Sequence, residues 1–349
     1  MKSVPNFSRH LVIVLCLFVY LANSVSARTD NYLSDIFKQT FPTFVFQQDK
    51  ARTLTAGETL EPELSGGASH SYKIKASANQ YLKIIIEQKG IDIVAELYFP
   101  DGKKLLEVDS PNGTQGPEPI ETITPVDGDY FLKVRSLENN APAGRYEIKV
   151  LELRTSTEKD KHSIAAQKAI QEANELKAKR TAQTYKNAIT KYEEAITHLK
   201  ATGDKAQEAN ILSNISHIYD LFGDNAKYIE YTIQALNLRK EIKDRIGEAE
   251  SLNNLAVGYS HIGDKEKALE IFNQALQLNR ELKLRKKEAS TLNNIGDLYK
   301  DNGDTKKAIE FLNQALPLWR LENDKSGEAK TLGEHGNHLS AGKRFFQCP

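Results

Sequence analysis

The chain has 349 residues, enough for two or three domains, and its composition of 40% hydrophobic and 27% charged residues excludes a wholly disordered protein. Lys plus Arg and Asp plus Glu both number 47, so the basic excess of a phosphate-neutralising protein is missing and we expect no nucleic-acid partner. Its 2 cysteines, Cys16 and Cys348, exclude a disulfide framework and a four-cysteine zinc module.

The N-terminus predicts a secretory signal peptide over residues 1–27. Basic residues precede an apolar run at 11–22, and small residues then lead to a cleavage point after Ala27. The run is shorter than the about 20 residues of a membrane span, although an uncleaved N-terminal anchor is the alternative. We therefore expect a secreted or periplasmic bacterial protein with no integral membrane span after cleavage. Residues 28–50 are interpreted as a linker or lead-in segment.

Residues 51–154 predict an antiparallel β-sandwich. Short runs such as 71–76 and 81–87 alternate polar and apolar residues, which buries one face of each strand, and Gly, Pro and Asp mark the turns between them. Seven or eight such strands favour two packed sheets. Aspartates could supply oxygen ligands to calcium, but no contiguous Asp-x-Asp-x-Asp loop exists, so we interpret them as turn caps. The aspartates concerned are Asp92, Asp101, Asp109, Asp127 and Asp129.

Two of these strands share the pattern Gly-x-Tyr-x-Leu/Ile-x-Val, at residues 128–134 and 144–150. Together with Leu54-x-x-Gly57 and the turn Asp101-Gly102, the pattern resembles the bacterial pre-peptidase C-terminal domain, a jelly-roll-like sandwich appended to secreted proteins. The resemblance covers roughly residues 51–153. It implies an accessory module without catalytic residues, which would contact a surface, a glycan or a neighbouring domain.

From about residue 160 onward the sequence repeats with a period of 40 residues. Each unit predicts a helical hairpin; in the central unit, helix A spans about 247–262 and helix B about 265–284. Gly263 is expected to end helix A and Asp264 to cap helix B. We expect three units within 206–332, a degenerate hairpin at 155–205 before them, and stacking of neighbours into an all-α solenoid. Residues that recur at this spacing are Leu212, Leu252 and Leu292; Tyr219, Tyr259 and Tyr299; and Gly223, Gly263 and Gly303.

The segments Leu252-Asn253-Asn254-Leu255-Ala256 and Leu292-Asn293-Asn294-Ile295-Gly296 resemble helix A of the kinesin-light-chain type of tetratricopeptide repeat. The usual repeat has about 34 residues; here the extra length is expected to extend helix B. The resemblance implies a scaffold whose inner groove binds extended or helical peptides. It is specific for the fold and unspecific for the partner.

Helix A positions beside the core stripe are expected to face this groove. Asn253 and Asn293 are the strongest candidates, because a carboxamide offers both donors and an acceptor to a peptide backbone. Asn214, Asn254 and Asn294 adjoin the core and are expected to bond a neighbouring helix instead. The mixed charges predict no preference for an acidic or a basic peptide. The predicted groove consists of Asn210, Ser213 and His217, then Glu250, Asn253 and Ser260, then Ser290, Asn293, Asp297 and Lys300, flanked by Asp220 and Val257.

The repeat pattern fails after Leu332, and residues 333–349 predict an irregular tail. His335 and His338 with Cys348 are interpreted as solvent-facing rather than as a metal or thiol site. Pro317 is expected to kink helix B of the third unit near its end, where Trp319 joins the core.

No catalytic motif is found, so we assign no catalytic, cofactor-binding or metal residues and no cofactor. The leading hypothesis is a secreted or periplasmic non-enzymatic scaffold that holds a protein or peptide partner in its repeat groove. Two alternatives stay open. The chain could be a truncated or regulatory part of a CHAT-type peptidase system, because similar secreted repeat proteins continue into a CHAT peptidase domain, or it could be an envelope assembly factor.

Overall fold

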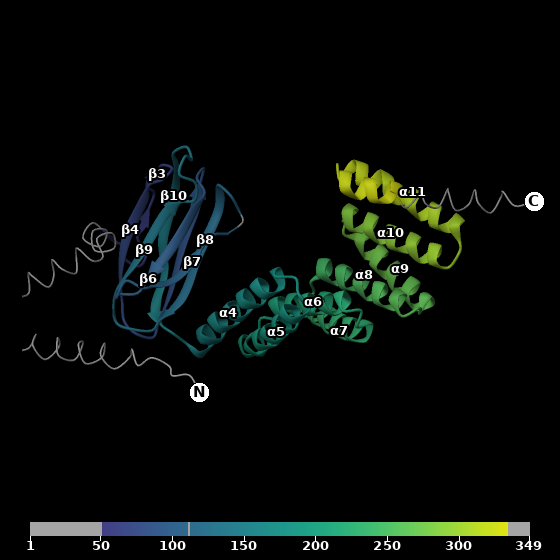
Figure 1. The fold of residues 1–349 in the computed structure, drawn as a ribbon, viewed down its shortest axis with the longest axis horizontal. Helices are drawn as coiled ribbons and strands as arrows, with labels where there is room; N and C mark the ends of the chain where they lie inside the picture. Colours follow the sequence, from purple (N-terminus) through teal and green to yellow (C-terminus); the bar gives the residue numbers. More distant parts are fainter. Residues whose placement is uncertain (1–50, 111, 334–349) are drawn as a thin grey trace, which may run out of the picture. The chain divides into compact units, whose positions relative to one another are not determined.

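The computed structural model describes residues 51–110 and 112–333 and divides between Thr157 and Glu158 into two units, a β unit and a helical unit (Figure 1). The predicted signal peptide, the 28–50 segment, and residues 334–349 with His335, His338 and Cys348 lie outside the described residues. The predicted fold class is confirmed, since two β-sheets are followed by a series of helical hairpins.

The β unit contains two sheets with strand orders β1-β4-β9-β6-β7 and β2-β10-β5-β8, and β3 pairs with β10 beside β2. All the strand pairs are antiparallel except β1 with β4. The strands are β1 Arg52–Thr53, β2 Thr59–Leu60, β3 Glu63–Leu64, β4 Ser69–Ala76, β5 Gln80–Lys89, β6 Ile93–Tyr98, β7 Lys104–Val108, β8 Gln115–Thr124, β9 Gly128–Ser136 and β10 Gly144–Thr155.

Alternation along the strands places one face of each sheet in a shared core. In β5, Leu82, Ile84 and Ile86 are fully buried, and they join a single cluster with Leu132 of the first sheet and Tyr146 of the second. The edge strand β8 contains two prolines, at 117 and 119, which lack the N–H groups that a further strand would need. The single core cluster shared by β5, β9 and β10 shows that the inner faces of the two sheets pack together as in a sandwich.

The helical unit begins with the hairpin α4–α5 and continues with three similar hairpins, α6–α7, α8–α9 and α10–α11 (Figure 1). α8 and α9 both span 17 residues, so helix B is no longer than helix A and ends before the predicted boundary. α11 runs through Pro317, and residues 325–333 are again helical. The helices are α4 Glu158–Ala178, α5 Ala182–Thr202, α6 Lys205–Leu221, α7 Asn225–Glu241, α8 Arg245–His261, α9 Lys265–Glu281, α10 Arg285–Asp301 and α11 Thr305–Leu321.

Two kinds of turn join the helices. Within a hairpin, Gly263 has a φ of 82° and Asp264 accepts a hydrogen bond from the Lys267 N–H at 3.2 Å, as predicted. Between hairpins, Gly203 has a φ of 76° after α5, but after α7 and α9 the left-handed position is held by Lys243 and Lys283, with φ of 59° and 57°, although glycine is the usual residue there. These two later turns carry no glycine signal, so sequence reasoning did not mark them.

Small residues set the helix spacing inside the helical unit. Ala235, Ala275 and Ala315 recur every 40 residues and are fully buried, which lets paired helices approach closely. Phe272 and Trp319 are buried in the same core. Among the described residues, no helix combines the length and apolar character that crossing a bilayer requires.

Candidate functional site

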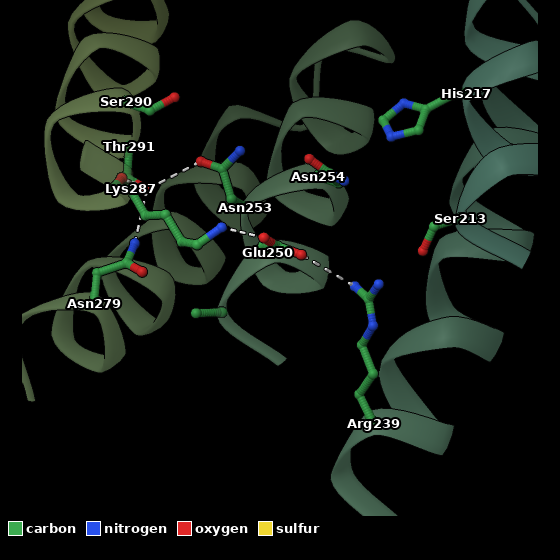
Figure 2. A pocket seen from close by; sticks show the side chains of 11 residues that line it. Ser213, His217, Arg239, Glu250, Asn253, Asn254, Asn279, Lys287, Ser290 and Thr291 are labelled. Carbon is green, nitrogen blue, oxygen red and sulfur yellow. Dashed lines mark hydrogen bonds and ion pairs between the residues drawn. The ribbon is translucent and has the colours of Figure 1, made fainter. Parts of the chain in front are cut away.

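Five predicted groove residues line one cavity of about 380 Å³ between α6, α8 and α10 (Figure 2). We call it the central pocket. Its predicted members come from three successive helices A, which the 40-residue spacing brings side by side. They are Ser213, His217, Glu250, Asn253 and Ser290. The remaining lining residues were not predicted, and they are Arg239, Ala249, Asn254, Asn279, Lys287 and Thr291.

A second cavity, of about 370 Å³, contains Ser260 of α8 and Asp297 and Lys300 of α10, all three predicted. Phe272 forms part of its wall, so the groove surface here lies directly on the core. The two cavities together account for eight of the ten predicted groove residues.

The other two predicted residues, Asn210 and Asn293, lie differently. Asn210 is exposed, and its Oδ1 accepts a hydrogen bond from Arg239 Nη2 at 3.3 Å. Asn293 is only 2% exposed, and its Nδ2 donates to the buried Thr331 Oγ1 at 2.7 Å. This corrects the predicted placement of Asn293 on the groove surface, because the helical residues 325–333 cover it.

We expect Asn293→Ala to lower the free energy of unfolding by about 1–2 kcal/mol, because it removes a buried hydrogen bond and leaves Thr331 Oγ1 without this donor. Ser290→Ala, one turn away and exposed, should change it by less than about 0.5 kcal/mol. Urea unfolding, followed by the fluorescence of Trp319, the single tryptophan of the chain, measures the free energy of unfolding of both variants. Equal stability of the two variants would argue against a structural role for Asn293.

The central pocket contains a short chain of charges. Glu250 lies between two cations, ion-paired through Oε1 with Lys287 Nζ and through Oε2 with Arg239 Nη1, the latter at 4.0 Å (Figure 2). Arg239 is 5% exposed, and its Nη1 also donates to the Gly247 carbonyl at 3.0 Å and to Ser251 Oγ at 2.7 Å. The guanidinium is thus fixed between α7 and α8 while its charge reaches the pocket.

Arg239 fits this position because Gly247 has no side chain. A Cβ built on Gly247 would lie 2.7 Å from Arg239 Cδ. Eighty residues later along the repeat, Trp319 packs on Gly327 in the same way, where a Cβ would lie 2.8 Å from Cε2 of the ring. In the intervening repeat the large and the small residue change places. The short Asn279 faces Thr291 at the position of Arg239, and a lysine stands at 287 in place of the glycine. Comparing these positions at the repeat spacing would have found the pairing in the sequence.

His217 lies in the central pocket close to other charged groups. Burial lowers the pKa of His217, and the positive charges of Lys177 and Arg239 lower it further, although Asp220 partly opposes them. Because the pKa lies below its usual value near 6.5, His217 is mostly neutral at pH 7. The pocket therefore gains no charge from this imidazole at neutral pH.

The asparagines next to the core stripe bond neighbouring helices, as predicted for two of them. Asn294 Nδ2 donates to Asn253 Oδ1 at 3.1 Å and joins α10 to α8. Asn214 Oδ1 accepts from Lys177 Nζ at 3.0 Å and joins α6 to α4. The third, Asn254, lines the central pocket instead.

The described residues contain no group of three or more His, Cys, Asp or Glu side chains placed to hold a metal ion. In the β unit, Asp101 and Asp127 cap turns by accepting hydrogen bonds from the N–H groups of Lys103 at 3.0 Å and Ala78 at 2.7 Å. The groove itself offers amides, hydroxyls and paired charges, which suit non-covalent recognition of a polypeptide.

Comparison with known proteins agrees with this architecture. Residues 228–281 and 289–317 match family models of the tetratricopeptide repeat. A search of the curated proteins found no match. Among solved structures, apo RapI is 20% identical with a TM-score of 0.46, and the match covers 53% of this chain and 65%, less than two thirds, of RapI.

Two other solved structures resemble parts of the chain. BtubC (BKLC) from P. vanneervenii is 20% identical with a TM-score of 0.37, over 54% of this chain and 86% of its own. The pre-peptidase C-terminal domain of collagenase from Bacillus anthracis is 20% identical with a TM-score of 0.24, over 29% of this chain and 93% of its own. The predicted tetratricopeptide repeats are confirmed, and the helical unit carries them within residues 228–317.

Proposed function

We propose that this chain is a secreted or periplasmic, non-enzymatic scaffold that binds a protein or peptide partner in the groove of its tetratricopeptide repeats. The observation that carries the proposal is the central pocket, where five groove residues from three successive helices A meet in one cavity. A surface that extends across α6, α8 and α10 suits an elongated ligand, because such a ligand can contact each repeat in turn.

The β unit has an accessory role in this proposal. Its charged residues pair with one another across neighbouring strands, as Glu96 of β6 does with Lys133 and Arg135 of β9, both at 3.7 Å. We propose that this unit contacts a surface or a glycan and positions the repeats, while partner recognition belongs to the groove.

Covalent capture tests the groove directly. A photo-crosslinking amino acid at Ser290, which is exposed and lines the central pocket, should trap a defined partner from a bacterial envelope extract. The same amino acid at Asn273, an exposed position on helix B, is the matched control and should not trap it. Ser290→Tyr should reduce capture of the same partner by the unlabelled chain, whereas Asn273→Tyr should not. Equal trapping from both positions would contradict a groove ligand.

The identity of the trapped partner separates the biological roles. A peptidase chain would favour a regulatory part in a peptidase system, and a component of an envelope complex would favour assembly. For the proposed location, N-terminal sequencing of the chain recovered from the periplasm or medium should start at Arg28. Recovery only from the cytoplasm with Met1 intact would contradict secretion.

A further inference from the structure

The charges that line the central pocket do not balance at neutral pH. Arg239 and Lys287 contribute two positive charges, Glu250 contributes one negative charge, and His217 is mostly neutral. One positive charge is therefore left without a counter-ion inside the pocket. Glu250 occupies the place between the two cations that a carboxylate from outside would also favour (Figure 2).

The amide of Asn253 is fixed with its donor side free. Its Oδ1 accepts a hydrogen bond from Asn294 Nδ2 at 3.1 Å and lies 3.1 Å from Thr291 Oγ1, whose single proton also has the Lys287 carbonyl at 3.0 Å as an acceptor. Within the described chain no acceptor bonds its Nδ2, and Figure 2 shows this nitrogen turned away from Thr291. Asn253 therefore offers a ligand two N–H donors rather than the mixed set expected from its sequence.

Two further polar atoms of pocket residues are buried without a partner. Arg239 Nε is a donor, and Asn279 Oδ1 is an acceptor. Arg239 and Asn279 are 5% and 1% exposed, so water reaches these atoms poorly and leaving them unbonded is costly. A peptide segment supplies both kinds of group, since it carries N–H groups and carbonyl or carboxylate oxygens.

We propose that the central pocket binds the side-chain carboxylate of an acidic polypeptide segment. Lys287 Nζ, Arg239 and Asn253 Nδ2 donate to the carboxylate, and Glu250 is the internal anion that the ligand displaces. Asn279 Oδ1 accepts an N–H of the same segment. The inference rests on the proposed groove function and makes it more specific: the partner carries an Asp or Glu at the position that enters this pocket.

The two sides of one ion pair should have opposite effects on binding. Lys287→Gln removes a donor to the ligand and is expected to weaken binding about tenfold, which is the effect of losing one charge-assisted hydrogen bond. Glu250→Gln removes the competing anion and is expected to strengthen binding about threefold or more. A purely structural role of the pair predicts weaker binding for both variants, so the signs distinguish the two explanations.

The experiment pans a random twelve-residue peptide library on the full mature chain and measures synthetic peptides by fluorescence anisotropy. Enriched peptides should share an Asp or Glu. Changing that residue to Asn or Gln should weaken binding to the wild-type chain about tenfold. The changed peptide should then bind Lys287→Gln and wild type with equal affinity. Lys287→Arg should keep the affinity within about threefold, because it retains the charge. Lys306→Gln removes the same charge at an exposed position of α11 and should change affinity less than twofold.

Failure of this inference differs from failure of the proposed function. Groove-bound peptides without a shared acidic residue, or weaker binding to Glu250→Gln, would overturn the carboxylate pocket and leave the groove function standing. Enrichment that Ser290→Tyr does not reduce would overturn the groove function, and the inference with it. Trp319 fluorescence of each variant confirms that the helical unit is folded.

Discussion

Gly247→Lys is expected to lower the free energy of unfolding of the helical unit by about 3 kcal/mol. Any Cβ at this position meets the carboxylate of Asp244, the residue that caps α8, and comes within 2.7 Å of Arg239 Cδ and 2.8 Å of its Nε. The buried guanidinium would have to leave its hydrogen bonds to Gly247 and Ser251, and a displaced buried cation is expensive. Urea unfolding followed by Trp319 fluorescence measures the loss, because Trp319 lies in α11 of the same unit.

Adding Arg239→Asn to Gly247→Lys should restore the part of this stability that the displaced guanidinium costs. At these two positions the double variant copies the next repeat, where Asn279 donates to Thr291 Oγ1 at 3.2 Å and a lysine occupies position 287; that repeat has Leu284 at the position of Asp244. The double-mutant cycle should therefore give a coupling of about 2 kcal/mol or more between the two positions. The reverse change, Lys287→Gly, lacks the clash and should cost about 1 kcal/mol, mainly through helix propensity. Additive effects of the two substitutions would refute the steric pairing.

The helical unit was predictable because one spacing repeats the same physical requirements. Leu252, Leu255 and Ala256 recur with neighbours at helical spacing, and all three are buried as expected. Gly263 and Asp264 are strong local signals, and their turn has the predicted geometry. The β unit was equally accessible from alternation, although short strands such as β1 and β2 have no sequence pattern of their own.

The groove was predicted only in part, because helix position does not determine how deeply a side chain is covered. Asn253 and Asn293 occupy equivalent positions, yet Asn253 is half-buried in a pocket and Asn293 is covered by the following helical residues. Arg239 and Asn279 enter the pocket from the ends of the second helices, a direction that counting positions on helix A does not consider. Their long-range hydrogen bonds decide the chemistry of the site, and only coordinates supply those contacts.

Phe272→Ala is expected to lower the free energy of unfolding by about 3–5 kcal/mol, because it leaves a cavity in the centre of the helical unit. Phe272 is 1% exposed and packs in the cluster that includes Leu252, Leu292 and Trp319. It also forms part of the wall of the second groove cavity, so the loss of packing should disturb the groove as well as the core. Partner capture through the crosslinker at Ser290 should fall together with stability.

Phe272→Leu is the matched control, since Leu312 occupies the equivalent position of the next repeat and is fully buried there. A leucine side chain fills most of the volume of the phenylalanine side chain, so Phe272→Leu should lower the free energy of unfolding by less than about 1.5 kcal/mol and should keep partner capture. Urea unfolding by Trp319 fluorescence compares the three chains at equal protein concentration. If Phe272→Ala unfolds at the wild-type midpoint, the side chain does not hold α8, α9 and α10 together, and the groove must be stabilised by the charged contacts at its surface.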